Sequence, residues 1–458
     1  MQFTTSCSFL ENELLDIARL FKNRAENISH AFLYENGVFY NAFSVDGEAF
    51  SFEDRGQVCG ELEFKRLERR FAKLRLYEIL SEKYGEKMPW GALTGIRPTK
   101  LAYTQIEKGE DFTKLFTTMQ VSGENIRLIQ DILSAQKGIY ERKDNNTALF
   151  ISLPFCPTKC AYCSFITAPI DKTRHFVPDY LNCLQKELSA CQKLQGNIRS
   201  IYIGGGTPFA LEFPDLQTVL EAVKPYKDAF PNAEYTVEAG RPDTFTEEKL
   251  ALLKEYGVNR ICINPQTFSN EVLQKIGRKH TVEDFYKAYE MSEKYGFLVN
   301  IDLIAGLESE SVESFAFGVE QAIKTGADNI TVHCLSLKSG AKLKEETSYL
   351  EKDGISEMIG VSRRLLSEAG YEPYYMYRQK YQAGNNENVG WTKKGRACIY
   401  NIDVMEETTN NLAVGSNAVS KRVWTDENRI ERLGSPKDLA TYIENIDKII
   451  VEKLEFFK

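Results

Sequence analysis

Residues 151–165 read ISLPFCPTKCAYCSF, and this stretch decides how the rest of the chain is interpreted. The apolar run Ala148–Leu153 reads as a buried strand, and it leads directly into a loop that carries Cys156, Cys160 and Cys163. At this C-x3-C-x2-C spacing, three thiolates can hold one face of an iron–sulfur cubane, which leaves the fourth iron without a protein ligand. The sequence therefore predicts a [4Fe–4S] cluster bound by these three cysteines.

An iron that is open in this way can bind a small molecule, and S-adenosylmethionine (SAM) suits it through its amino and carboxylate groups. A reduced cluster then cleaves the sulfonium bond and releases a 5'-deoxyadenosyl radical, which is chemistry that the cofactors carry. A zinc site is the alternative, and it would need a fourth Cys or His close by. Residues 164–166 (SFI) supply neither, and the nearest histidine is His175.

Short apolar runs alternate with longer amphipathic segments from residue 148 onward, which is typical of parallel strands joined by helices. Because six such units are too few for a closed eight-stranded barrel, we predict an α/β fold that is a partial (β/α)6 barrel. In such folds the chemistry lies where the strands end. The runs are Ala148–Leu153, Ile201–Ile203, Glu234–Val237, Arg260–Asn264, Val299–Ile304 and Ile330–Leu335.

Glycines and polar residues lie at or near the ends of these runs. Residues 204–208 (GGGTP) follow the second run, and glycine allows the backbone to approach a ligand closely. Acceptors for an ammonium and for ribose hydroxyls come from Glu238, Gln266 and Asp302, and Arg278 supplies a cation for a carboxylate. Each residue alone could belong to a turn, a cap or the surface, but their shared position favours one binding site.

The chain also contains regions before and after this core. Asn36-Gly37 lies in an aromatic-rich stretch and predicts a hairpin, while the polar run 141–147 (ERKDNNT) predicts a linker. Residues 371–381 are dense in tyrosine. We therefore predict three domains: an N-terminal α+β accessory domain (1–145), the core (146–345) and a mixed C-terminal covering domain (346–458).

Composition limits the partners. The formal net charge of -8 argues against bulk attraction to nucleic acid or anionic lipid. The sequence has no apolar run long enough to span a membrane and no basic leader, so we expect a cytoplasmic protein with reduced thiols. Of its ten cysteines only three are clustered, which favours metal binding over disulfides.

The cysteine loop, GGGTP and residues 260–280 (RICINPQTFSNEVLQKIGRKH) resemble the oxygen-independent coproporphyrinogen III oxidase family of radical SAM proteins over residues 148–345. Residues 90–101 (WGALTGIRPTKL) resemble its HemZ-type coproporphyrinogen dehydrogenase branch. The resemblance implies a tetrapyrrole substrate and an electron donor such as flavodoxin or ferredoxin. It also implies that the three cysteines hold the cluster and that SAM is contacted by Tyr162, Gly205, Gly206, Thr207, Glu238, Gln266, Arg278 and Asp302.

The chain departs from the family at several positions. Phe150 and Ser152 replace a usual Tyr and His, and Phe165 replaces the fourth Cys of the bacterial oxidases proper, as in the haem chaperones. Those chaperones carry an HNxxYW motif, whereas residues 386–391 read NENVGW here. The histidine proposed to hold haem is therefore missing.

Three functions remain open. The first is oxidative decarboxylation of two propionates of coproporphyrinogen III to vinyl groups, which forms protoporphyrinogen IX in haem biosynthesis. The others are a haem carrier that retains a SAM cluster and a radical SAM enzyme on another tetrapyrrole. We favour the first, because no histidine follows His333. A substrate with four carboxylates also requires cations near the open face of the barrel, and the candidates are Arg97, Lys100, Arg378 and Lys380.

Overall fold

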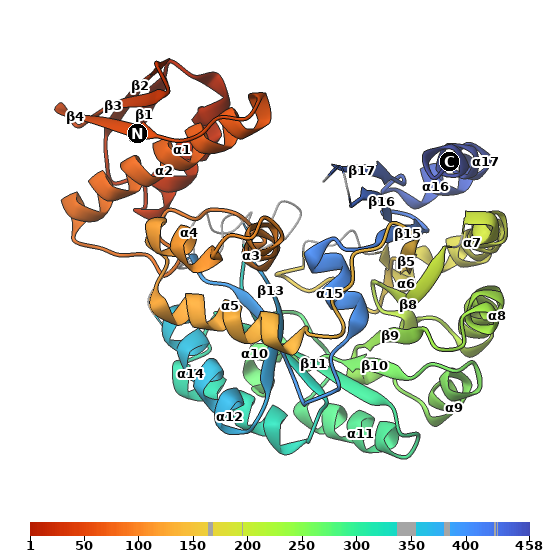
Figure 1. Ribbon diagram of the computed structural model, residues 1–458. Coiled ribbons are helices and arrows are strands. Elements are labelled where there is room, and N and C mark those ends of the chain that lie inside the picture. Colours follow the sequence, from red (N-terminus) through yellow and green to blue (C-terminus); the bar gives the residue numbers. More distant parts are fainter. Residues whose placement is uncertain (164–167, 195, 337–353, 380–384, 426, 428) are drawn as a thin grey trace. The chain divides into compact units, whose positions relative to one another are not determined.

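All six apolar runs form strands, and these strands lie in sequence order within one sheet of the computed structural model (Figure 1). Every neighbouring pair among them is parallel, which confirms the predicted series of βα units. Their side chains are almost entirely buried, as expected where helices cover a parallel sheet. The strands are β5 (Asn146–Leu153), β8 (Asn197–Gly205), β9 (Glu234–Gly240), β10 (Arg260–Ile263), β11 (Leu298–Ala305) and β12 (Asn329–Cys334).

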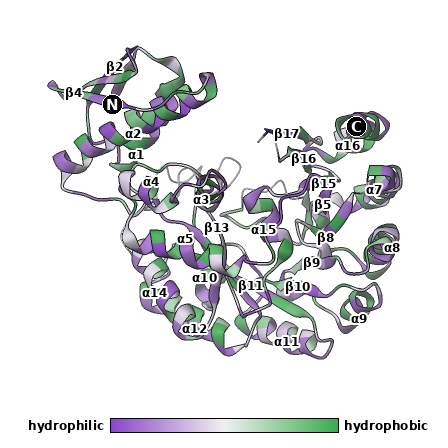
Figure 2. Cartoon of the chain, in the orientation of Figure 1, coloured by the Kyte–Doolittle hydropathy of each residue, from purple (hydrophilic) through white to green (hydrophobic). Residues whose placement is uncertain are grey.

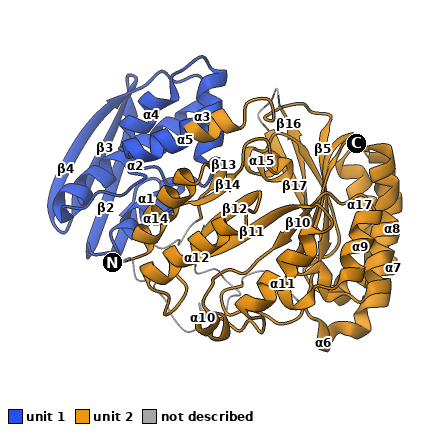
Figure 3. Ribbon diagram, turned by 90° about the horizontal axis from the view of Figure 1, so that it is seen from below, with its two compact units in different colours: residues 1–130, 384–386 blue, residues 131–383, 387–458 orange. Residues whose placement is uncertain are grey.

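The structure describes residues 1–163, 168–194, 196–336, 354–379, 385–425, 427 and 429–458. The chain divides into two compact units (Figure 3). One contains residues 1–130 and 384–386, and the other contains residues 131–383 and 387–458. The domain boundaries predicted at residues 145 and 345 stay predictions.

Helices connect the six strands, and all of them except the four-residue α6 bury apolar residues. Figure 2 shows hydrophobic and hydrophilic residues on the longer of these helices, as expected for one buried and one exposed face. Thr281 and Asp284 form a capping box that fixes where α11 begins. The connecting helices are α6 (Ile170–Thr173), α7 (Val177–Cys191), α8 (Phe213–Ala229), α9 (Glu247–Glu255), α10 (Asn270–Lys275), α11 (Val282–Glu293) and α12 (Val312–Lys324).

The C-terminal part extends the same sheet at both edges. Beyond β12 lie β14 (Asn388–Thr392) and β13 (Glu372–Tyr377), both antiparallel to their neighbours. At the other edge β15 (Asn410–Val414) pairs with β5 in parallel. Strands β16 (Val419–Trp424) and β17 (Arg429–Gly434) follow it, so the sheet has 11 strands. The helices of this part are α14 (Ile355–Glu368), α15 (Ile399–Glu406), α16 (Leu439–Glu444) and α17 (Ile446–Phe456).

The first unit has its own four-stranded sheet. The predicted hairpin is confirmed, because Glu35 pairs with Val38 and both Asn36 and Gly37 have positive φ. The strands are β1 (Gln2–Thr5), β2 (Asn27–Glu35), β3 (Val38–Val45) and β4 (Glu48–Arg55). The helices are α1 (Glu11–Leu20), α2 (Glu61–Tyr84), α3 (Pro98–Glu107), α4 (Phe112–Thr118) and α5 (Gly123–Ala135), the last of which spans the division between the units. Among the described residues, no helix is both long and apolar enough to cross a membrane.

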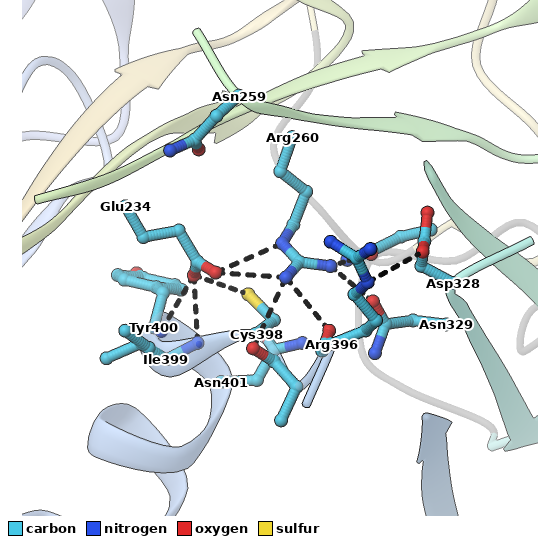
Figure 4. Close-up of polar contacts among 12 residues, drawn as sticks. Glu234, Asn259, Arg260, Asp328, Asn329, Arg396, Cys398, Ile399, Tyr400 and Asn401 are labelled. Atoms are coloured by element: carbon cyan, nitrogen blue, oxygen red, sulfur yellow. Dashed lines mark hydrogen bonds and ion pairs between the residues drawn. The ribbon is translucent and has the colours of Figure 1, made fainter. Parts of the chain in front are cut away.

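A buried ion pair joins β9 to β10 at the ends where these strands begin (Figure 4). The Arg260 guanidinium donates to Glu234 Oε2 from Nε at 3.2 Å and from Nη2 at 3.0 Å. Arg260 also donates from Nη1 to Asn300 Oδ1 at 2.8 Å and to Asn329 Oδ1, so four neighbouring strands meet at one side chain. With 1% of Arg260 exposed, this cluster is shielded from water.

The same ion pair anchors the segment that leads into α15. Arg260 Nη2 donates to the carbonyl of Arg396 at 2.9 Å. Glu234 Oε1 accepts from the backbone amide of Ile399 at 2.8 Å and from Cys398 Sγ at 3.2 Å. The C-terminal part is therefore tied to the end of the sheet opposite the predicted site.

Candidate functional site

A cavity of about 300 Å³ lies at the carboxyl ends of the six parallel strands. All the residues singled out as cluster ligands or SAM contacts line it, namely Cys156, Cys160, Tyr162, Cys163, Gly205, Gly206, Thr207, Glu238, Gln266, Arg278 and Asp302. They come from the loops or strand ends of five neighbouring strands, β5 and β8 to β11. The structure thus brings together residues that span about 150 positions of the sequence, because parallel strands present their carboxyl ends at one edge.

The cysteine loop is held by backbone contacts with the segment that follows α10. Ala161 N donates to Ile276 O at 3.0 Å, and Thr158 Oγ1 donates to Gly277 O at 3.2 Å. Arg241 Nη1 donates to Thr158 Oγ1 at 2.9 Å, while Nε and Nη2 of the same guanidinium each bind Asp243 at 2.9 Å. These contacts fix the loop before any ligand binds.

The three thiols line one cavity and are the donor type that an iron–sulfur cluster takes. Among the residues that the structure describes, no group of three or more His, Cys, Asp or Glu side chains is arranged to hold one metal ion. In a cubane each thiolate binds a different iron, so the thiolates need not converge on one point. Burial raises the pKa of Cys156 to about 12, and a bound metal supplies the positive charge that a thiolate requires there.

The glycine turn packs against the cysteine loop as well as lining the cavity. A Cβ on Gly206 would lie 2.5 Å from Phe155 O and 2.8 Å from Leu153 O, so no side chain fits there. Gly206 N donates to Leu153 O at 2.7 Å. Gly205 has a φ of +102°, which glycine adopts without strain. The turn therefore needs glycine in order to approach the strand that leads to Cys156.

Two buried polar atoms in the cavity have no hydrogen-bond partner among the described residues. These are Asn264 Oδ1 and Arg278 Nε. Arg278 uses its other nitrogens, because Nη1 donates to Asn264 O at 2.5 Å and Nη2 donates to Tyr162 OH at 3.2 Å. Buried polar groups are almost always paired, so these atoms point to a polar ligand.

Gln266 has an unusual backbone conformation beside this pair. Its φ is +70°, although it is not glycine. Hydrogen bonds on both sides hold it, since Gln266 N donates to Asp302 O at 3.0 Å and Ile304 N donates to Gln266 O at 2.9 Å. A strained residue kept in place by its neighbours is typical of a functional site.

Glu238 carries the most perturbed carboxylate of the cavity. Its Oε1 accepts from Tyr202 OH at 2.5 Å. Burial, and to a smaller extent the nearby Asp302, raises its pKa from 4.5 to about 7. Between about pH 4.5 and 7, the folded protein therefore holds a proton that the unfolded chain releases, so this group destabilises the fold as the pH rises through that window.

Replacing Glu238 with Gln should remove that pH dependence. With no SAM added, the free energy of unfolding of E238Q should exceed that of the unchanged protein increasingly between about pH 5 and 8, by up to about 3 kcal/mol. Urea unfolding at several pH values measures the difference. E310Q should show a similar change, because burial also raises the pKa of Glu310 to about 7, outside the cavity. E248Q is the matched control, because Glu248 is exposed in the first turn of α9 and does not line the cavity. Parallel stability curves for E238Q and the unchanged protein would contradict the prediction.

The sequence analysis missed several lining residues. Arg241 and Asn264 follow β9 and β10 directly, so the rule about strand ends would have found them. His333, Tyr377 and Asn388 come from β12, β13 and β14, and the last two strands were not expected to join the sheet. His333 Nδ1 lies 3.0 Å from Tyr377 OH, and Nε2 lies 3.6 Å from Asp302 Oδ1.

One predicted cation is placed differently from expectation. Arg378 is 4% exposed and is not among the residues that line the cavity. Burial lowers its pKa to about 9, and Glu387 is its charged neighbour. It therefore does not belong to an open cluster of cations, because the side chain turns into the protein from β13. Lys380 lies outside the described residues.

Comparison with known proteins identifies the family. Residues 150–317 match the radical SAM superfamily. The chain is 36% identical over 397 residues to the oxygen-independent coproporphyrinogen-III oxidase-like protein HemZ of Bacillus subtilis, a match that covers 83% of this chain and 79% of that protein. It is 29% identical over 284 residues to the haem chaperone HemW of Escherichia coli, covering 61% of this chain and 71% of the relative.

A solved structure shares the fold. Coproporphyrinogen III oxidase (HemN) from Escherichia coli, described as a radical SAM enzyme, superposes with a TM-score of 0.52 at 21% identity. The superposition covers 71% of this chain and 73% of that one. The cysteine loop lies at the carboxyl ends of a parallel sheet, and the match to HemZ covers most of both chains. The chain therefore belongs to the radical SAM superfamily and, within it, to the HemZ-like proteins related to oxygen-independent coproporphyrinogen-III oxidase.

Proposed function

We propose that this protein is a cytoplasmic radical SAM enzyme that converts two propionates of coproporphyrinogen III to vinyl groups, which forms protoporphyrinogen IX. Its core would be a partial (β/α)6 barrel that binds a [4Fe–4S] cluster and SAM. The observation that carries the proposal is the cavity that joins the three thiols to Asn264 Oδ1 and Arg278 Nε, two buried atoms that have no hydrogen-bond partner among the described residues. The identity of 36% to the HemZ relative supports the tetrapyrrole substrate class.

Different residues of the cavity would hold the cluster and SAM. Cys156, Cys160 and Cys163 would bind the cluster, and the Arg278 guanidinium would bind the SAM carboxylate. Glu238 and Asp302 would accept hydrogen bonds from the ammonium and ribose hydroxyls. When bound, cluster and SAM together supply a radical that removes hydrogen from a substrate carbon. The protein orients the substrate and excludes water.

The opposite side of the cavity is the proposed place for the tetrapyrrole. His333, Tyr377 and Asn388 line it there, on the strands most distant from β5 in the series. The His333–Tyr377 contact fixes the ring plane of the imidazole. Because the imidazole and the phenol are bonded to each other, the neutral pair can donate one hydrogen bond to a propionate carboxylate. It comes from Nε2–H when the phenol donates to Nδ1, and from the phenol when Nδ1–H donates to the phenol oxygen.

A haem carrier is the second candidate, because the haem chaperone of Escherichia coli aligns with this chain over 71% of its own length. Anaerobic incubation of the reconstituted protein with SAM, a reductant and coproporphyrinogen III separates the candidates. We expect products that carry vinyl groups, formed with consumption of SAM. Stoichiometric binding of added haem, with no vinyl product from coproporphyrinogen III, would favour the carrier. Modification without vinyl formation of a different tetrapyrrole, supplied in place of coproporphyrinogen III, would favour the third function.

Asp302→Ala and Gln266→Ala should weaken SAM binding without removing iron. A lost hydrogen bond to a charged group costs about 1.5–3 kcal/mol, so the SAM concentration needed for half-maximal cleavage should rise about tenfold or more. Titration of SAM cleavage, with iron content measured on the same samples, checks the prediction. Asp328→Ala is the control, since that carboxylate caps the start of β11 outside the cavity. Titrations of both cavity variants that overlay the unchanged protein would refute these two assignments.

A further inference from the structure

Basic side chains surround the cysteine loop, although the chain as a whole has a net charge of -8. They are Lys159, Lys172, Arg174, Lys275 and Lys279, all exposed, and together we call them the basic rim. Residues 156–163 and 274–280 contain no Asp or Glu, and Asp171 is the one acidic residue of 168–176. These three segments together hold six Lys or Arg residues against one Asp, so their net charge has the opposite sign to that of the whole chain.

Backbone contacts hold the basic rim together. Lys159 lies between two of the cluster cysteines, and a Cβ on Gly277 would lie 3.8 Å from its carbonyl oxygen. The segment that carries Lys275 and Lys279 is bonded to the cysteine loop through Ile276 and Gly277. On the other side, Cys156 pairs with Pro169, which leads directly into α6 and Lys172. The cations thus occupy the outer surface of one folded loop cluster.

Most of this charge is not neutralised. Lys159, Lys172 and Lys279 form no ion pair with any residue that the structure describes. Lys275 pairs with Glu271 at 2.8 Å and Arg174 pairs with Glu212 at 2.9 Å, but all four side chains are more than 40% exposed. Exposed pairs of this kind contribute little, so an acidic partner can displace them.

We propose that the basic rim is the docking surface for an acidic one-electron carrier protein that reduces the cluster, an inference that rests on the proposed function. A reduced flavodoxin serves as the probe, because its flavin hydroquinone gives up one electron to become a semiquinone and the cluster accepts that electron. No covalent bond forms or breaks. A partner seated on this loop would contact Lys159, which stands between Cys156 and Cys160 in the segment that would hold the cluster. Opposite charges steer such a partner to this surface.

Charge reversal at the rim tests the proposal on the reconstituted holoprotein. In stopped-flow experiments at low salt, K159E/K279E should accept electrons from flavodoxin hydroquinone about tenfold more slowly or worse, and the difference should shrink as salt screens the charges. Absorbance of the cluster gives the rate directly. Reduced methyl viologen, a small cation that needs no docking surface, should reduce the variant at least as fast as the unchanged protein.

K193E/K324E is the matched control. It changes the net charge equally, and both lysines are exposed at the ends of helical segments that run away from the cavity, after α7 and in the last turn of α12. Its rate with flavodoxin should stay near that of the unchanged protein. If flavodoxin reduced the cluster equally slowly in K159E/K279E and in K193E/K324E, the proposal would be overturned, because the rate would then depend only on the net charge of the protein.

An unchanged flavodoxin rate in K159E/K279E would also overturn it. If methyl viologen reduction slows in that variant, K159Q/K279Q decides the question, because it removes the cations without placing acids beside the cluster. If flavodoxin hydroquinone reduces the cluster of K159Q/K279Q as fast as that of the unchanged protein, the basic rim is not the docking surface. Failure of the proposed function is distinguishable, because absence of a vinyl product leaves the measured rates of electron entry unaffected.

Discussion

Replacing Cys156, Cys160 or Cys163 with alanine, one at a time, should give a protein that loses the brown colour of the cluster or holds it only weakly. Three thiolates are the smallest set that leaves one iron open for a ligand, and two cannot hold the same cubane firmly. SAM cleavage should then fall to background. Iron and sulfide analysis after anaerobic reconstitution measures the first effect, and formation of 5'-deoxyadenosine measures the second.

Cys183→Ala is the matched control for these variants. Cys183 belongs to α7 outside the cavity, and its thiol reaches only the Ile443 carbonyl at 3.8 Å. Its iron content and SAM cleavage should equal those of the unchanged protein. Full iron content and intact cleavage in all three loop variants would refute both the cluster and the function that depends on it.

Arg260→Met should destabilise the larger unit by about 3–5 kcal/mol, because it leaves the Glu234 carboxylate buried without its counter-charge. The double variant E234M/R260M should recover much of the loss, since replacing both charges with apolar groups avoids the buried, unpaired ion. Urea unfolding followed by circular dichroism measures both effects.

Lys224→Met supplies the comparison for Arg260→Met. Lys224 pairs with Asp228 at 2.5 Å, but both side chains are more than half exposed. Such a pair is worth about 0–1 kcal/mol. If R260M were no less stable than K224M, the network in Figure 4 would not be what ties the segment before α15 to strands β9 and β10.

The sequence predicted the strands and the candidate site where the type of a residue and its place in the βα series indicated the same role. The six strands could be predicted because each is a short apolar run bounded by turn residues, and the site followed because parallel strands share one functional edge. Arg241 and Asn264 were within reach of the same rule. Arg241 belongs to none of the quoted motifs, and Asn264 lies within residues 260–280 but was not singled out there.

Other features depend on contacts that local sequence does not contain. Strands β14 and β15 were missed because they pair with β12 and β5, which lie far from them in the chain. Strands β13, β16 and β17 join the sheet only through these two strands. Arg378 was assigned to an open surface on charge alone, whereas it follows β13 directly and is buried. The hydrogen bond from Ile399 N to Glu234 could not be predicted either, because no motif marks the residues around Glu234 or those before α15.

Strand β15 has a consequence for how the protein is made. It lies beside β5, the strand that delivers the cluster cysteines, yet Asn410 and Thr147 are partners across more than 260 residues. During synthesis from the ribosome, the first strand of the core therefore waits with one hydrogen-bonding edge uncovered until nearly the whole chain has emerged. Uncovered edges invite pairing with other chains, and late pairings slow folding. The edge of β5 that β15 covers in the folded protein is therefore open to pairing with other chains until residues 410–414 have been synthesised.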